Sequence, residues 1–273
     1  MPAREDRAAA AVSPAGAAAG VVAVLGLGEA GAEISRDLVA SGVTVRGYDP
    51  VTRGPDGIVA ASSDADACSG SDLVLSLTTA HEAEAAFLAS VPGLSPGALF
   101  ADLNTASAEL KQRLASMAEQ RGIAFADVAI MAPVPGRGIR APMLVSGAAA
   151  AEVAAALASL GGNAEVIAGP AGAAASRKLV RSVFYKGMAA AVVESLRAGR
   201  AAGCADWLRE NIAEDIGAAT LDRLEQGSIA HAARRADEMS AAAAMLGELR
   251  VPARIATASR DWLEQLAVEA RGA

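Results

Sequence analysis

The stretch SRKLVRSVFYKGM, residues 176–188, carries polar side chains at a spacing that suits acid–base chemistry. Lys178, Ser182 and Tyr185 stand at positions i, i+4 and i+7, so one stripe of a helix presents all three. A lysine whose pKa is lowered by burial can take the proton of an alcohol while a hydride leaves the carbon. The alternative is a lysine that extends its ammonium group into water. The apolar residues of the stretch predict a buried helix face: Leu179, Val183, Phe184 and Met188.

A glycine-rich turn near the start of the sequence has the spacing of a dinucleotide-binding loop. Gly26, Gly28 and Gly31 follow the apolar run 21–25 in the order G-x-G-x-x-G, and a helical pattern follows them. The first glycine permits a tight turn, the second lets backbone approach a pyrophosphate, and the third lets helix and strand pack closely. The helix N-terminus then offers its free N–H groups to the phosphates.

Other predicted cofactor contacts lie where strands end. Asp49 ends the second strand, where a carboxylate accepts both ribose hydroxyls and repels a 2′-phosphate. Arg53 in the next loop is either a solvated arginine or a partner for that phosphate, so NAD is slightly favoured and NADP stays open. The polar strand ends are turn or capping residues in the alternative interpretation. The predicted contacts are Gly26, Leu27, Gly28, Glu29, Ala30, Gly31, Asp49, Leu77, Thr78, Thr79 and Asn104.

The elements that must position these residues alternate between strand and helix. Helical patterns at 107–121 and 149–160 stand among the apolar runs, which indicates an α/β fold with a parallel, doubly wound sheet. From Pro170 onward only helical periodicity is evident. We therefore predict a flexible tail at 1–19, a nucleotide-binding domain at 20–169 and an all-helical domain at 170–273. The predicted strands are 21–25, 43–49, 71–79, 98–104, 123–130, 141–147 and 164–169.

Composition excludes several classes of function. The 24 basic and 31 acidic residues give a net charge of −7, which argues against nucleic acid or an anionic membrane as the main partner. Cys68 and Cys204 belong to no Cys/His cluster, so we predict neither a metal site nor a disulfide framework, and a reduced, cytoplasmic setting. The segment 1–19 lacks the strongly apolar stretch of a secretory signal, and no run of about 18 apolar residues predicts a membrane span.

Four motifs resemble the β-hydroxyacid dehydrogenase superfamily, which includes 6-phosphogluconate and 3-hydroxyisobutyrate dehydrogenases. They are GLGEAG (26–31), DLNTAS (102–107), DVAIMAP (127–133) and GPAGAAASRKLVRS (169–182). The C-terminal half resembles a subgroup related to phosphogluconate dehydrogenase. The resemblance implies a Rossmann domain that binds NAD or NADP, a helical domain, and hydride transfer to or from a small anionic hydroxy acid. It places the catalytic lysine of the family at Lys178.

The resemblance also implies substrate-binding residues, and here the sequence departs from the family. Met131, Ala132 and Pro133 stand where the family has the Ser-Gly-Gly of its substrate loop. Ser182 replaces an asparagine, and Tyr185 replaces the glutamate of 6-phosphogluconate dehydrogenases. We predict these five residues as substrate contacts, while the substrate itself and any decarboxylation stay open.

The roles of Arg137, Arg140, His231 and Arg234 stay open. Arg137 and Arg140 either pair with a substrate anion or are solvated, and His231 is either a substrate contact or a packed residue. Arg234 and Glu238 at i, i+4 predict a surface ion pair.

Three functions remain for comparison: a hydroxy acid dehydrogenase, a reductase of C=N bonds with the same architecture, and a nucleotide-binding protein without catalysis. We expect a homodimer, because a helical segment of about a hundred residues gains burial by pairing with a second copy.

Overall fold

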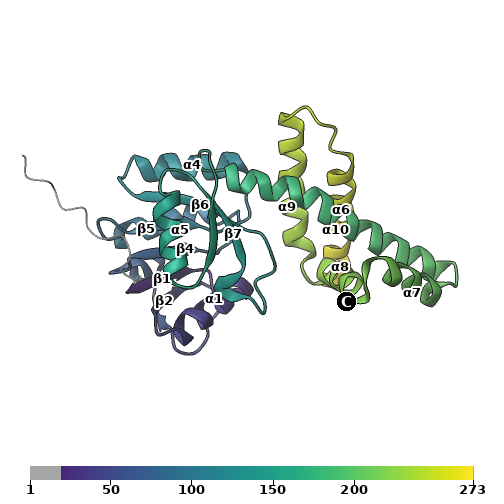
Figure 1. The fold of residues 1–273 in the computed structure, drawn as a ribbon, viewed down its shortest axis with the longest axis horizontal. Coiled ribbons are helices and arrows are strands. Elements are labelled where there is room, and N and C mark those ends of the chain that lie inside the picture. Colours follow the sequence, from purple (N-terminus) through teal and green to yellow (C-terminus); the bar gives the residue numbers. More distant parts are fainter. Residues whose placement is uncertain (1–19, 273) are drawn as a thin grey trace, which may run out of the picture.

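The computed structural model describes residues 20–272, so the tail predicted at 1–19 lies outside the described residues. Figure 1 shows a body of strands and helices followed by a body of helices. Within residues 20–272 the strands form one eight-stranded sheet in the order β3-β2-β1-β4-β5-β6-β7-β8. They are β1 (Val21–Leu25), β2 (Thr44–Tyr48), β3 (Val59–Ala60), β4 (Leu73–Ser76), β5 (Leu99–Asp102), β6 (Ala124–Ile130), β7 (Pro142–Ser146) and β8 (Asn163–Val166).

The predicted doubly wound α/β sheet is confirmed, with one exception to its parallel order. Strand β7 runs antiparallel to β6, while every other neighbouring pair is parallel. The connection between β6 and β7 holds only a short turn, Gly138–Arg140, where a parallel pair needs a full crossover. The prediction of an entirely parallel sheet was therefore wrong at β7.

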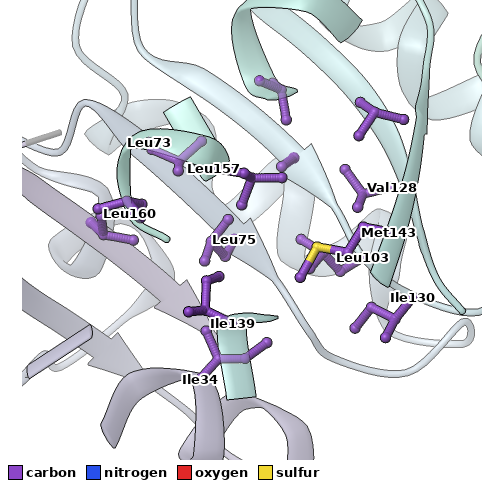
Figure 2. Close-up of a cluster of buried hydrophobic side chains, with 14 of the residues drawn as sticks. Ile34, Leu73, Leu75, Leu103, Val128, Ile130, Ile139, Met143, Leu157 and Leu160 are labelled. Atoms are coloured by element: carbon purple, nitrogen blue, oxygen red, sulfur yellow. The ribbon is translucent and has the colours of Figure 1, made fainter. Parts of the chain in front are cut away.

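Helices cover both faces of the sheet, as the continuous apolar strands require. Residues Val22 and Val24 of β1 pack with α1 (Glu29–Ala40) and α5 (Ala150–Ser159). Figure 2 shows this cluster, in which Ile34 and Leu157 come from the two helices. The alternate residues of β1 belong to the opposite cluster. That cluster includes α2 (Asp64–Cys68), α3 (Ala83–Ser90) and α4 (Ala108–Glu119).

Only helices follow β8 in the described residues. The long helix α6 runs from the sheet into the helical body (Figure 1). Leu179 and Val183 of α6 pack against the last two helices, but Phe184 is 65% exposed, so the prediction that it is buried was wrong within the single chain. The neighbouring helices cover only one side of α6 there. The five helices are α6 (Ala173–Ala201), α7 (Ala205–Ile216), α8 (Ala218–Ala230), α9 (Ala232–Glu248) and α10 (Arg254–Gly272).

A buried ion cluster joins the sheet to the start of α6. The ammonium group of Lys111, on α4, donates to the carbonyl oxygen of Asp102 at 2.7 Å. It lies 3.0 Å from a carboxylate oxygen of Asp102 and 3.0 Å from one of Asp127. The other oxygen of Asp127 accepts the backbone N–H groups of Gly172 at 2.9 Å and Ala175 at 3.0 Å. Burial alone would lower the pKa of Lys111, but the two carboxylates raise it, so the lysine stays charged.

We expect Lys111→Met to destabilise the protein strongly, because it leaves two buried carboxylates without their cation. The free energy of unfolding in urea should fall by about 3–5 kcal/mol. Gln112→Met, at an exposed position of the same helix, is the control and should change it by less than about 0.5 kcal/mol. Equal stability of the two variants would show that the cluster contributes little.

Candidate functional site

The glycines of the predicted dinucleotide loop have different structural roles. A Cβ atom on Gly26 would lie 2.5 Å from the carbonyl oxygen of Leu77, and one on Gly31 would lie 1.9 Å from that of Gly26. These two positions are required for the packing of β1, β4 and α1. A Cβ on Gly28 would meet nothing within 4 Å. Gly28 is the N-cap of α1 and provides no side-chain cap, so the first N–H groups of the helix are available to an anion.

Asp49 supports this loop from the end of β2. One carboxylate oxygen accepts the N–H of Leu27 at 2.8 Å, and the other accepts those of Val51 and Thr52, also at 2.8 Å. Burial would raise the pKa of Asp49, but these three hydrogen bonds lower it, so the group is a carboxylate at neutral pH. A cavity of about 550 Å³ borders Leu27, Thr52 and the exposed Arg53.

The ends of β4 and β5 meet beside the glycine loop. The hydroxyl of Thr78 donates to the side-chain oxygen of Asn104 at 3.4 Å. The amide nitrogen of Asn104 donates to Ser76 and to Asp102, so this buried side chain has a set orientation. Thr79 instead accepts the N–H of Glu82 at 3.3 Å, as a turn residue does.

Lys178 reaches the same edge of the sheet from α6. Its ammonium group donates to the hydroxyl of Thr105, which follows Asn104, at 2.6 Å. Burial is the main cause that lowers the pKa of Lys178 to about 8, against the opposing charge of Glu238. The positive charges of Lys186, Lys111 and Arg234 lower the pKa of Lys178 further. A lysine with this pKa can exchange a proton near neutral pH.

Ser182, one turn after Lys178, is buried against α9. Its hydroxyl donates to a carboxylate oxygen of Glu238, and Lys186 lies 3.0 Å from the same oxygen. Burial would raise the pKa of Glu238, but Lys186 and Lys178 lower it below its ordinary value. The predicted surface pair of Arg234 and Glu238 was therefore wrong, since Glu238 is only 5% exposed. The signal in the sequence was its place on the helix face of Ala242 and Met245, both buried.

The ring of Tyr185 contacts Arg181 and Phe184, and not Lys178 and Ser182 as the helical spacing predicts. The guanidinium of Arg181 lies 4.2 Å from the centre of its ring, and the ring of Phe184 meets it edge-on at 5.1 Å. Its side chain is 36% exposed. Ser182 and Lys186, which both donate to Glu238, instead lie on the side of α6 that faces α9.

The predicted substrate loop 131–133 lies beside the first turn of α6. Met131 packs against the buried cluster that includes Ala174 of α6, and its N–H donates to the carbonyl of Pro142 at 2.8 Å. Ala132 is half-buried, and Pro133 is exposed. Further along this loop, Arg140 turns towards α1, where it lies 3.5 Å from Asp37, and Arg137 is exposed.

Helix α9 also reaches the glycine loop, through a contact that the sequence does not indicate. His231 at its N-cap lies 3.6 Å from the carboxylate of Glu29, the first residue of α1. Burial is the main cause that lowers the pKa of His231, so the ring is neutral at neutral pH. Thus α9 contacts the glycine loop at one end and Ser182 of α6 further along.

Residues 20–272 contain neither a candidate metal cluster nor a helix that could span a membrane. No group of three or more His, Cys, Asp or Glu side chains there is placed to hold a metal ion. None of the helices in this part of the chain has the length and apolar character needed to cross a membrane.

Family models match both the sheet-containing and the helical part of the chain. The family model described as the NAD binding domain of 6-phosphogluconate dehydrogenase matches residues 21–169. A domain of unknown function, DUF1932, matches residues 200–266. The NAD-dependent L-serine dehydrogenase of Pseudomonas aeruginosa is 31% identical over 124 residues, which cover 42% of this chain and 40% of that enzyme.

Solved structures extend the likeness into the helical half. A conserved hypothetical protein from Sinorhizobium meliloti 1021 is 28% identical, with a TM-score of 0.66 over 89% of this chain and 87% of that one. A reductive aminase from Aspergillus terreus shares the fold at 22% identity, with a TM-score of 0.63 over 92% of this chain and 94% of that one. Because the NAD-binding model spans more than half of the sequence, the chain belongs to the 6-phosphogluconate dehydrogenase-like family, within the β-hydroxyacid dehydrogenase superfamily.

Proposed function

We propose that the protein transfers a hydride between NAD(P) and a small β-hydroxy acid or its keto form, with Lys178 as the general acid and base. The observation that carries the proposal is the hydrogen bond of 2.6 Å from Lys178 to Thr105, because it holds a lysine of lowered pKa at the edge of the sheet next to the glycine loop. The curated relative supports the substrate class, since L-serine carries a β-hydroxyl group and a carboxylate.

The residues of the loop fit a dinucleotide. The open side of Gly28 and the uncapped start of α1 accommodate a pyrophosphate, and the carboxylate of Asp49 can accept ribose hydroxyls. The bound nicotinamide would supply the hydride acceptor or donor. In oxidation, neutral Lys178 takes the proton of the substrate hydroxyl; in reduction, charged Lys178 polarises the carbonyl and returns that proton. Thr105 and the buried charges around Lys178 hold its amine in position.

We expect NAD to bind more tightly than NADP, because the carboxylate of Asp49 repels a 2′-phosphate. Equilibrium titration of both cofactors by protein fluorescence measures this preference. Gly28→Ala should weaken both by about tenfold or more, since its methyl group enters the space left for the pyrophosphate, without lowering the stability of the free protein. Tighter binding of NADP would show that Arg53 decides the choice.

Lys178→Met should lower turnover by about 10²–10⁴-fold, the usual effect of one positioned proton-transfer group. L-serine and 3-hydroxyisobutyrate are first tested with the wild type, and the variant is then measured with the acid that the wild type oxidises. NAD affinity should change little, because the glycine loop and Asp49 belong to the sheet. Arg177→Gln, at the exposed neighbouring position, is the control and should keep full activity.

The pH dependence of the same reaction separates catalysis from a structural effect. Because the pKa of Lys178 is about 8, the rate of oxidation should rise as pH increases through 8, where the amine loses its proton. The rate of reduction should fall over the same range. Full activity of Lys178→Met would exclude the acid–base role. Turnover of imines but of no hydroxy acid would replace the proposal with C=N reduction, and cofactor binding without any turnover would leave a binding protein.

We also propose a homodimer formed through the helical body. Val180 and Phe184 on α6 are 53% and 65% exposed, and Ile255 on α10 is 58% exposed. A Cβ on Gly187 would lie 2.6 Å from Ile255, so these side chains belong to adjoining helices. Light scattering at micromolar concentration should give the mass of a dimer, and Phe184→Glu should shift it towards a monomer. A monomeric wild type would contradict the proposal.

A further inference from the structure

Helix α9 presents a stripe of side chains to the space between the glycine loop and α6. His231 contacts Glu29 at one end of this stripe, and Glu238 contacts Ser182 two turns later. Arg234 and Arg235 lie between them in sequence, one turn from either end. Helical spacing therefore places both arginines near the side of α9 that carries His231 and Glu238.

Their environments then differ. Arg235 is half-buried towards α8, where its guanidinium donates to the hydroxyl of Ser228 at 3.2 Å and lies against Gly227. Arg234 is exposed, and among the ion pairs and hydrogen bonds of residues 20–272 its guanidinium has no partner. It is the arginine of the stripe that can take a ligand.

The surrounding charge favours an anion. Lys178, Lys186, Arg234 and Arg235 gather here, and the buried Glu238 already accepts from Ser182 and Lys186. Burial is the largest cause that lowers the pKa of both Lys178 and Lys186. The charge of Arg234 lowers both pKa values further, together with other nearby cations. Arg234 is therefore within electrostatic reach of the proposed acid–base group.

Three groups of the loop after β6 are not free to bind an anion beside the first turn of α6. The N–H of Met131 is already bonded to Pro142, and Pro133 has no N–H to give. Arg140 of the same loop is turned towards Asp37. Met131, Pro133 and Arg140 therefore do not compete with the exposed guanidinium of Arg234 for a substrate anion.

We propose that Arg234 binds the acid group of the substrate, a carboxylate or a phosphate, and thereby selects anionic hydroxy compounds. The inference rests on the proposed function, because it places that acid group beside the hydroxyl served by Lys178. A guanidinium holds either anion through paired hydrogen bonds.

A binding experiment tests the inference without turnover. Protein saturated with NADH, which fills the pyrophosphate site, is titrated with oxalate and with inorganic phosphate by calorimetry. Arg234→Gln should weaken the preferred anion by about 10- to 100-fold, as expected for a lost charge-assisted contact. Arg223→Gln, an exposed arginine on α8, is the matched control and should bind as the wild type does. The tighter of the two anions identifies carboxylate or phosphate as the group recognised.

A turnover experiment separates this inference from the proposed function. The wild type should prefer L-serine to its methyl ester, and Arg234→Gln should lose that preference through KM more than through kcat. Anion binding that depends on Arg234, without oxidation of any hydroxy acid, would support the site and overturn the proposed function. Equal anion affinity in the wild type and Arg234→Gln, or no anion binding to the NADH complex, would overturn the inference.

Discussion

The buried contact of Lys111 with Asp102 and Asp127 connects the elements on which the candidate site depends. On one side, Asp102 ends β5 and holds Asn104, and Thr105 comes next. On the other, Asp127 accepts N–H groups from the first turn of α6, about one turn before Lys178. The hydrogen bond between Lys178 and Thr105 therefore joins two segments that the same ion cluster already holds together. Such a cluster is costly to break because each charge is buried.

The site separates residues needed for folding from residues available to ligands. Gly26 and Gly31 are packed against backbone, whereas Gly28 faces open space. Around Lys178, Glu238 is bonded to its neighbours, whereas Arg234 is not. In the proposed anion site the exposed guanidinium of Arg234 would hold the acid group of the substrate, while Met131, Pro133 and Arg140 of the loop after β6 supply no free donor. Burial and the surrounding cations lower the pKa of Lys178 to about 8, which the proposed acid–base role requires.

Local patterns in the sequence predicted seven of the eight strands and the glycine turn, since each depends on residues close together in the chain, but they missed the two-residue β3. They also grouped Tyr185 with Lys178 and Ser182, whereas its ring contacts Arg181 and Phe184. The direction of β7 was not predictable, because apolar periodicity carries no information about strand direction. Glu238 and Lys111 were missed as parts of the site because their partners come from other elements, and a charged side chain is ordinarily exposed. The prediction that Phe184 is buried was wrong for a related reason. Periodicity identifies an apolar helix face, but packing decides which side of that face is covered.

A crystal structure of the protein with NADH and oxalate tests the central claim most directly. We expect the nicotinamide ring at the end of β4 and β5, and an oxalate oxygen within hydrogen-bond distance of Lys178. The reacting carbon of a substrate would then lie about 3–3.5 Å from the ring. A nicotinamide bound away from Lys178, or an anion bound outside the cleft while Lys178 contacts only Thr105, would contradict it.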